Sequence, residues 1–555
     1  MAFTMSRWSV AKSAISSRGG MVVAKQEAAA RAGAQVLAEG GNAIDAVVTM
    51  GWCMAVMEPY QCTIGGAGYT IFRPVDGEPV VVEFTGRAPA KATQEIMGDR
   101  KPGQPFRGAL ALGVPGTVAG LALALERFGS ISLARSLEPA IALAEEMPLD
   151  FFMALRITQG LQALRANPDS ARAFLSENDP PLAHGQYVIR QTDLARTLRA
   201  IAEQGPRVFY EGEIARELVR AVRERGGVLE ESDLADYQAN ILPALRGRFR
   251  DYDLLAVPVP SPGLTTVEAL QILDGFDLAG MGHNSADALH VIGEASRLAF
   301  ADRDAYLGDP LFGEIPVDEL LSEEYTQQRR AEIGIERAMA EVRPGRLGVA
   351  AWGSAGGGGG TTNICAVDAA GNMVSHTQTC IGGFESFGVA GSTGVIPSSS
   401  LQWFDANPGR PNSLEPGKRP VTNMTPMIVE RDGRAVLAVG APGSRRIMNA
   451  VSQVILNVIE FGMEPQAAVS APRIDYSTPR LCADDRIDAS VLAELERRGH
   501  TIERVHEFIS YGGPEASFPG FTGYFARPNA ILIDADGTRH GGDYPGAFGT
   551  VIAVE

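Results

Sequence analysis

The chain has 555 residues, of which 45% are hydrophobic and 21% charged, a composition typical of a globular protein with a large core. Its formal net charge of −17 argues against a nucleic-acid partner, because nucleic-acid-binding proteins present a basic face. No apolar run is long enough to predict a membrane-spanning helix and no apolar leader precedes Arg18, so we expect a cytoplasmic protein without a membrane partner.

The five cysteines and seven histidines are scattered along the chain. No two cysteines have the CxxC spacing that is typical of zinc or redox sites. The sequence therefore predicts neither a metal ion nor another cofactor.

The first elements in chain order are two helices within residues 25–58, separated by Gly40-Gly41-Asn42. The second helix is apolar on nearly every side, which indicates that it is buried. Strands are predicted at 69–72 and 80–84. The glycines at 65–68 lack the spacing of a phosphate-binding loop and precede a strand, so they indicate a turn.

The middle third of the chain, to about residue 340, is predicted to be mainly helical. Pro115 suits the first turn of a helix, since its missing N–H costs nothing there. Ser285 is a candidate N-cap for a helix that ends near Tyr306.

Beyond Thr361 the pattern changes to strands, which predicts a layered α+β architecture with helices outside. Turn-forming residues between short apolar runs indicate three hairpins. The expected strands are 364–367 with 373–379, 427–430 with 435–439, and 530–533 before a turn at 534–537; a helix is expected at about 446–461.

Five glycines, 356–360, directly precede Thr361 and Thr362 at this change of pattern. Glycine adopts backbone conformations that strain other residues, and a strained peptide bond is open to attack by a neighbouring hydroxyl. Cleavage of the Gly360–Thr361 bond would leave Thr361 with both a hydroxyl nucleophile and an α-amine base. Taken alone, the glycine run is equally well interpreted as a flexible linker before a strand.

Several further blocks, in this order along nearly the whole chain, resemble the γ-glutamyltransferases, a family of N-terminal-nucleophile hydrolases. The resemblance implies a four-layer αββα sandwich, made as an inactive precursor that is cut before a nucleophilic threonine. Residues 1–360 would form the large subunit and 361–555 the small one, intertwined in one unit. The blocks are 39–46, 113–120, 301–310, Thr361-Thr362, 418–420, 424–426 and 440–444.

Carried over by motif position, Thr361 resembles the nucleophile, with its freed amine as the base. Thr379 matches the threonine that hydrogen-bonds the nucleophile, although by itself it could be an ordinary strand residue. Gly443 and Ser444 match the turn whose N–H groups form the oxyanion hole, although such a turn before a helix also presents N–H groups without a catalytic role.

The resemblance is broken where the family binds its substrate. Thr422 and Asn423 match paired serines that contact the substrate α-carboxylate. Trp403 occupies the position of the acid that holds the α-amine, where only a cation–π contact remains available. Threonine replaces the family's carboxylate-binding arginine, and Arg87 follows two residues later, as a replacement or as an ordinary surface residue.

Two more departures concern the mouth of the site. A substrate-contacting asparagine of the family falls near Ile381, and the segment 407–418 is short, as in members that lack a lid. An open mouth would admit bulky substrates.

These departures favour an amide hydrolase or acylase that acts on a small carboxylate-bearing amide through an acyl-threonine, with water or an amine as acceptor. The family includes such members, among them cephalosporin acylases and oxamate amidohydrolases. The alternatives are a true γ-glutamyl transpeptidase or glutathione hydrolase, and a non-catalytic relative that binds a small molecule. The two subunits from one precursor could assemble further as a homodimer of heterodimers.

Overall fold

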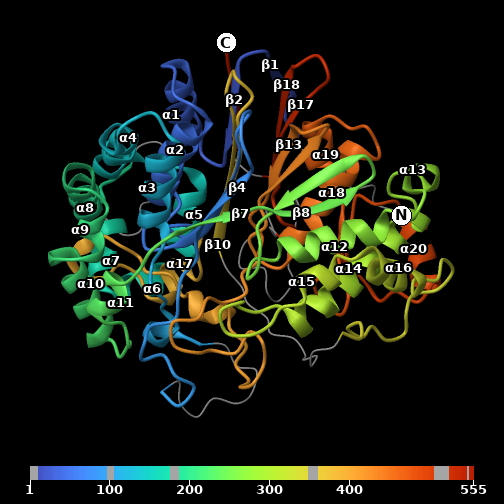
Figure 1. Cartoon of the computed structure of the whole chain (residues 1–555). Helices are drawn as coiled ribbons and strands as arrows, with labels where there is room; N and C mark the ends of the chain where they lie inside the picture. Colours follow the sequence, from blue (N-terminus) through green and yellow to red (C-terminus); the bar gives the residue numbers. More distant parts are fainter. Residues whose placement is uncertain (1–10, 97–105, 176–186, 348–359, 506–523, 547–548) are drawn as a thin grey trace, which may run out of the picture.

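Two seven-stranded sheets lie face to face in the middle of the molecule, and helices cover the outer face of each (Figure 1). This arrangement confirms the predicted α+β class and the αββα layering. The computed structural model describes residues 11–96, 106–175, 187–347, 360–505, 524–546 and 549–555. Of the glycine run, Gly360 alone lies within the described residues.

The first sheet is antiparallel throughout and carries Thr361 near its centre. Its strands are, in spatial order, β19 (Thr550–Val554), β2 (Gly20–Ala24), β10 (Gly360–Val367), β11 (Met373–Cys380), β3 (Ala67–Arg73), β4 (Val80–Phe84) and β7 (Asn240–Pro243). Strands from before and after the Gly360–Thr361 bond are therefore hydrogen-bonded to one another within one sheet.

The second sheet is also antiparallel and combines strands from both sides of that bond. All three predicted hairpins are confirmed, as β10–β11, β12–β13 and β17–β18. The strands of the second sheet are, in spatial order, β1 (Ile15–Ser17), β18 (Arg539–Asp543), β17 (Asn529–Ile533), β13 (Arg434–Gly440), β12 (Met427–Arg431), β9 (Tyr252–Ala256) and β8 (Leu245–Phe249).

The helices over the first sheet include the buried helix that the sequence predicts. Every residue of α2 (Ala43–Met57) is buried, and Asn42 and Asp45 form a capping box at its start. The other helices on this side are α1 (Glu27–Ala38), α3 (Thr117–Phe128), α4 (Leu133–Glu145), α5 (Phe151–Gln159), α6 (Leu161–Ala166), α7 (Pro168–Phe174), α8 (Thr192–Gln204), α9 (Arg207–Tyr210), α10 (Glu213–Glu224) and α11 (Glu231–Ala235).

The helices over the second sheet include α14 (Ala286–Tyr306), whose predicted N-cap is confirmed, because the Ser285 hydroxyl accepts from the N–H of Ala288. The helix predicted at 446–461 is α18 (Arg446–Ile459). The others are α12 (Gly263–Leu273), α13 (Leu278–Met281), α15 (Val317–Leu320), α16 (Glu323–Ala331), α19 (Pro465–Ser470) and α20 (Ala489–Arg497).

Smaller elements complete the fold. They are the strand pair β5 (Met147–Pro148) and β6 (Val188–Ile189), the small sheet of β14 (Ile474–Asp475), β15 (Leu481–Asp484) and β16 (Ile502–Val505), the helix α17 (Gly383–Ser386), and the 3₁₀ turns η1 (Gly108–Ala111), η2 (Gly391–Thr393) and η3 (Ser400–Trp403).

The middle third is mainly helical, as predicted, but the prediction missed three strands, and the expectation for Pro115 is wrong. Residues 240–256 are not helical but form β7, β8 and β9, which lie at or near an edge of the two sheets. Pro115 lies before α3 rather than in its first turn, because the helix begins at Thr117 with Gly116 as its N-cap. The N–H groups of Gly116 and Thr117, which have no partner within the helix, both donate to the carbonyl of Gly66.

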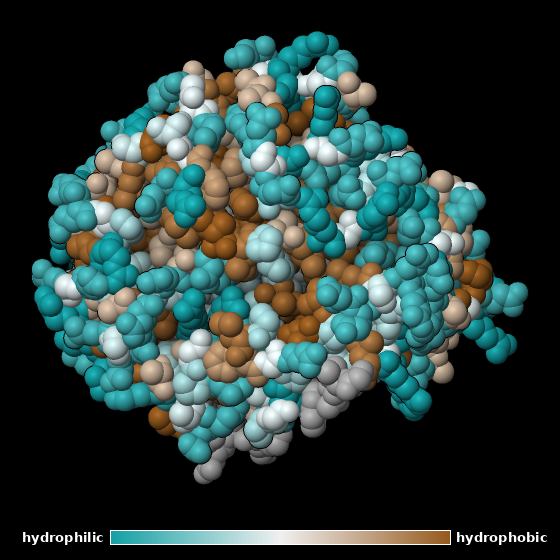
Figure 2. All heavy atoms as spheres, viewed as in Figure 1, coloured by the Kyte–Doolittle hydropathy of each residue, from teal (hydrophilic) through white to brown (hydrophobic). Residues whose placement is uncertain are grey.

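Alternation along the strands divides the interior into separate apolar layers. In β10, Ile364 and Ala366 face the helices, whereas Cys365 and Val367 pack between the two sheets. On the face shown in Figure 2, hydrophilic side chains cover most of the outer helices, and hydrophobic side chains show mainly toward the centre. The predicted nucleophile therefore lies on a strand that is covered on both faces.

Candidate active site

Thr361 and Thr379 lie directly opposite each other at the start of β10 and the end of β11. Because side chains alternate along a strand, both share the face that carries Cys365 and Val367, between the sheets. They are 6% and 1% exposed. The hairpin thus brings together the two threonines that the sequence paired.

A chain of hydrogen bonds joins both hydroxyls to the carbonyl of the predicted scissile bond. Thr361 Oγ1 donates to Thr379 Oγ1 over 3.2 Å, and Thr379 Oγ1 donates to the carbonyl oxygen of Gly360. A Cβ atom on Gly360 would lie 2.4 Å from the carbonyl oxygen of Tyr60, so only glycine fits at this position. Thr379 is therefore placed to support attack on that carbonyl as well as to orient Thr361.

Thr379→Ala is expected to lower kcat by roughly 100-fold with a smaller change in KM, because the lost hydrogen bond acts in the chemical step. Self-cleavage should slow as well, since Gly360 loses its hydroxyl donor. Steady-state kinetics on the fully processed variant and a time course of cleavage on denaturing gels measure both effects. Unchanged turnover in the processed variant would remove Thr379 from the mechanism.

Gln61 also contacts Thr361, and the sequence gave no signal for it. Its side-chain oxygen Oε1 accepts a hydrogen bond from the backbone nitrogen of Thr361 over 2.8 Å. Its own backbone is fixed, because its N–H donates to the carbonyl of Glu58 and its carbonyl accepts from Cys380. After cleavage the same nitrogen is the α-amine, so Gln61 is placed to orient the predicted base. A hydrogen bond between residues 300 positions apart leaves no local sequence pattern.

Replacement of Gln61 is expected to move the pH dependence of kcat/KM. Gln61→Glu places a carboxylate beside the α-amine of Thr361 and so raises the pKa of that amine. The acidic limb of the pH profile of kcat/KM then shifts to higher pH by about one unit. Gln61→Met removes the acceptor, destabilises the ammonium form and shifts that limb to lower pH. Burial raises the pKa of Glu58 to about 7, so the variants are compared in a Glu58→Gln background. An acidic limb at the same pH in all variants would contradict the role of Gln61 in orienting the α-amine.

Gly443 and Ser444 form a tight turn between β13 and α18. Their φ angles are +151° and +59°, and a Cβ atom on Gly443 would lie 2.4 Å from Ala526 Cβ. Gly440 at the end of β13 packs against the side chain of Asn363 in β10, which brings the turn over the first sheet. Gly443 and Gly360 line one cavity of about 400 Å³. The predicted oxyanion donor therefore lies on the same cavity as the scissile bond.

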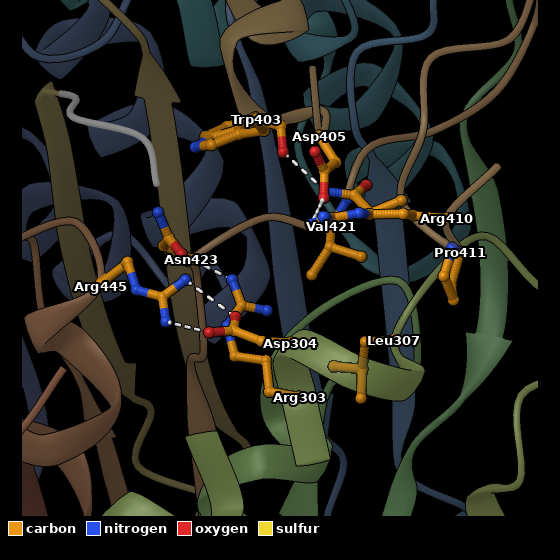
Figure 3. A pocket seen from close by; sticks show the side chains of 11 residues that line it. Arg303, Asp304, Leu307, Trp403, Asp405, Arg410, Pro411, Val421, Asn423 and Arg445 are labelled. Carbon is orange, nitrogen blue, oxygen red and sulfur yellow. Dashed lines mark hydrogen bonds and ion pairs between the residues drawn. The ribbon is translucent and has the colours of Figure 1, made fainter. Parts of the chain in front are cut away.

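A second pocket holds the predicted substrate-binding residues Trp403 and Asn423 (Figure 3). The Asn423 carboxamide oxygen accepts from Arg303 Nη2 over 2.8 Å, and the same nitrogen donates to the carbonyl of Thr422 over 3.0 Å. In Figure 3 the amide nitrogen of Asn423 points toward the Trp403 side of the pocket. Arg303 thus fixes Asn423 with its amide N–H groups available to a ligand oxygen.

Each acid in this pocket is engaged by an arginine (Figure 3). Both carboxylate oxygens of Asp304 accept from Arg445, at 3.0 and 2.9 Å, and Asp405 pairs with Arg410 at 2.9 Å. Burial and the nearby charge of Arg445 lower the pKa of Arg303 to about 9, and its Nε has no partner among the described residues. The pocket therefore favours a negatively charged or hydrogen-bond-accepting group over an ammonium.

Arg87 lies apart from these residues. Its guanidinium stacks on Tyr237 at 5.3 Å and Nη2 donates to the carbonyl of Gln238, and it lines neither pocket. Ile381 lines the cavity beside Gly360 and belongs to the same buried apolar cluster as Trp403. The short segment 407–418 does not leave the second pocket bare, because Arg410, Pro411 and Asn412 line it.

Among the residues that the structure describes, no group of three or more His, Cys, Asp or Glu side chains is placed to hold a metal ion. In the same residues, no helix has the length and apolar character needed to cross a membrane.

Comparison with known proteins assigns the chain to a family. The family model described as Gamma-glutamyltranspeptidase matches residues 29–513. The acylase ACY 1 proenzyme of Pseudomonas sp. (strain V22) is 36% identical over 98% of this chain and 95% of its own length. The glutathione hydrolase proenzyme of Escherichia coli (strain K12) is 34% identical over 88% of this chain and 86% of its own length. A cephalosporin acylase from Bacillus halodurans superposes with a TM-score of 0.89 at 29% identity, covering 100% of this chain and 99% of its own.

Proposed function

The chain belongs to the gamma-glutamyltranspeptidase family and is an autoprocessed amide hydrolase, and we propose that it acts on amides whose acyl group carries a carboxylate and needs no α-amine. The supporting observation is the pocket around Trp403, where Asp304 and Asp405 are each paired with an arginine. An ammonium entering it would lose its hydration without gaining a free carboxylate. A non-catalytic role does not fit its enzyme relatives.

We assign the chemistry to Thr361 of the cleaved chain. Its hydroxyl attacks the amide carbonyl and its α-amine takes the proton, while the N–H groups of Gly443 and Ser444 stabilise the oxyanion. The C–N bond then breaks, the amine product leaves with that proton, and an ester to Thr361 remains. Water or a second amine takes the acyl group from this ester.

The acyl group is proposed to reach from Thr361 into the Trp403 pocket. Ile381 lines the cavity beside Gly360, Trp403 lines the second pocket, and both side chains belong to one buried apolar cluster. Gln402, the chain neighbour of Trp403, also lines the cavity beside Gly360, so the two cavities are adjacent. Asn423 and the buried Arg303 supply the polar end, where a terminal carboxylate of the acyl group would be bound.

A panel of p-nitroanilides tests this proposal: glutaryl, γ-glutamyl and acetyl. Glutaryl hydrolysis at a rate equal to or above that of the γ-glutamyl compound is expected, and acetyl should be a poor substrate because it lacks the carboxylate. Comparable rates for acetyl and glutaryl would show that the pocket does not recognise a carboxylate.

True γ-glutamyl transfer is the second candidate, and one observation favours it. Asp405 lies two residues beyond Trp403 and lines the same pocket, so a movement of Arg410 would free a carboxylate for a substrate ammonium. Cytoplasmic location and the pairing of two heterodimers stay predictions from the sequence and its resemblance.

A further inference from the structure

A group of buried polar side chains joins the two sheets just beyond Thr361, in a layer that is mainly apolar. Asn363 follows Thr361 by two residues in β10, and Thr377 lies opposite Asn363 in β11, so both side chains point into the space between the sheets. Asn529 of β17 meets them from the second sheet. All three side chains are fully buried, and the mechanism above uses none of them.

Two hydrogen bonds connect Asn363 and Asn529 across the gap between the sheets. Asn529 Nδ2 donates to the backbone carbonyl of Asn363 over 2.9 Å, which leaves Asn529 Oδ1 as an acceptor. Asn363 Nδ2 donates to that oxygen over 2.8 Å, and Asn363 Oδ1 accepts from the Thr377 hydroxyl over 2.5 Å. The reverse orientation of the Asn363 amide would place two carboxamide oxygens 2.8 Å apart, so the orientation is fixed.

The second sheet is shaped to receive these side chains. Asn529 lies directly opposite Gly440 of β13, and a Cβ atom on Gly440 would overlap the Asn363 carboxamide. One residue earlier on β13, the carbonyl of Val439 accepts from the Ser375 hydroxyl of β11 over 2.9 Å. Polar contacts, which we call the inter-sheet bridge, therefore hold both strands of the β10–β11 hairpin to β13 and β17.

The inter-sheet bridge restricts sliding of one sheet over the other. Apolar contacts between stacked sheets have no preferred direction, whereas hydrogen bonds require a defined distance and angle. A buried amide that loses its partner is costly, so a shift of either sheet would be opposed by the whole bridge. The bridge thus fixes how the sheets are aligned at the end nearest to Thr361.

This alignment matters because the two sheets carry different parts of the reaction. The nucleophile Thr361 stands in β10, two residues before Asn363. The N–H groups assigned to the oxyanion belong to Gly443 and Ser444, which follow the last residue of β13, Gly440, by three and four positions. The distance between nucleophile and oxyanion donors therefore depends on how the sheets are held together.

On the basis of the acyl-threonine chemistry proposed above, we propose that Asn363 and Asn529 are positioning residues that set the distance between the nucleophile and the oxyanion donors. A misplacement of reacting groups by about 1 Å costs about 100-fold in rate. Neither asparagine lines the Trp403 pocket, where the acyl group is bound. Loss of the bridge should therefore lower kcat and leave KM nearly unchanged.

Apolar replacement of the whole bridge separates positioning from stability. Asn529→Leu alone leaves the Asn363 amide unpaired, and should lower both Tm and kcat. The triple variant Asn363→Leu/Thr377→Val/Asn529→Leu removes the side-chain partners together, so its Tm should recover toward that of the wild type. Its kcat should stay about tenfold or more below the wild-type value. Recovery of kcat together with Tm would overturn the inference and leave the proposed function intact.

Two further variants complete the test. Asn457→Leu is the matched control, because it removes a buried amide in the helix layer, where Asn457 Nδ2 of α18 donates to the carbonyl of Ala468 over 3.1 Å. It should lower Tm without changing kcat. Ser375→Ala leaves both bridging amides in place and should lower kcat by about threefold or more. It keeps the test available if the triple variant does not fold, and unchanged kcat in Ser375→Ala would then contradict the inference.

Modification of Thr361 by phenylmethanesulfonyl fluoride, followed by mass spectrometry, tests the inference without an amide substrate. The threonine oxygen displaces fluoride from sulfur, its proton passes to the α-amine, and a sulfonyl oxygen takes the place of the oxyanion. If the wild-type enzyme cleaves none of the p-nitroanilides, the proposed substrate class fails and this rate alone decides the inference. The rate should fall about tenfold or more in the triple variant, and equal rates would overturn the inference.

Discussion

Thr361→Ala is expected to give a single uncut chain without amide hydrolase activity. One hydroxyl performs both reactions: it attacks the Gly360 carbonyl during maturation and the substrate carbonyl afterwards. Without it the α-amine is never released, so the base is missing as well. On a denaturing gel the wild-type 58.8 kDa chain should separate into fragments of about 38 and 21 kDa, in proportion to residues 1–360 and 361–555, whereas the variant stays at full length.

Thr362→Ala is the matched control, because it removes a hydroxyl from the next residue of the same strand. The Thr362 hydroxyl is buried and has no hydrogen-bond partner among the described residues, so its loss should leave cleavage complete. The assignment fails if Thr361→Ala is still cut at the same bond. It also fails if a folded wild-type chain remains uncut and yet hydrolyses amides.

Much of the fold was predictable because its strongest elements carry local patterns. The hairpin of β10 and β11 follows from alternation around a five-residue turn, and α2 from a continuous apolar run with Asn42 before it. Residues 240–256 gave no such signal. β7 and β9 pair with β4 and β12, which are distant in sequence, and burial along β7 and β8 is incomplete. β8 and β9 also form a local hairpin, but its turn at Arg250 and Asp251 lacks the Asn-Gly or Asp-Gly pair that is typical of such turns.

The candidate site likewise contains some residues that the sequence predicts and others that it does not. Thr361, Thr379, Gly443 and Asn423 stand in motifs that could be matched one by one. The fold places Thr379 opposite Thr361, Gly443 on the cavity beside Gly360, and Asn423 on the second pocket. The contacts that tune the site were not predictable, because they join residues remote in sequence. Gln61 reaches Thr361 across 300 positions, and Arg303 reaches Asn423 across 120.

Arg87 shows that a residue close to a family motif position in the sequence need not lie in the site. The sequence left it open as a replacement for the family's carboxylate-binding arginine, and the structure places it over Tyr237. The position of the family arginine is occupied by Thr85, whose hydroxyl donates to Glu83. The Trp403 pocket instead contains the guanidinium of Arg303, which comes from α14.

Trp403→Asp is expected to move the preference of the enzyme from glutaryl toward γ-glutamyl amides. Trp403 is 6% exposed, belongs to the same buried apolar cluster as Ile381 and Met424, and lines the pocket, so an uncharged acyl chain can lie against its indole. The wild-type enzyme should therefore use glutaryl amides at least as well as γ-glutamyl amides. An aspartate at this position supplies the carboxylate that an ammonium needs.

The loss of a large side chain also leaves a cavity and adds a buried charge near Arg303 and Arg445. Trp403→Asn is the matched control, since it leaves the same space without the charge. The ratio of kcat/KM for γ-glutamyl over glutaryl p-nitroanilide should be at least tenfold higher in the aspartate variant than in the asparagine variant. Equal ratios would mean that Arg303 or Arg445 neutralises the new carboxylate, and that its charge does not reach the substrate.

The wild-type measurement decides between the two candidate functions. A preference of the wild-type enzyme for γ-glutamyl amides by more than about tenfold, or roughly 1.4 kcal/mol of transition-state free energy, would contradict the role given to Trp403. The ammonium would then have a carboxylate partner, and Asp405, two residues beyond the indole and paired with Arg410, is placed to be that partner. In that case Asp405→Asn should remove the preference while Trp403→Asn retains it, and γ-glutamyl transfer would become the function to pursue.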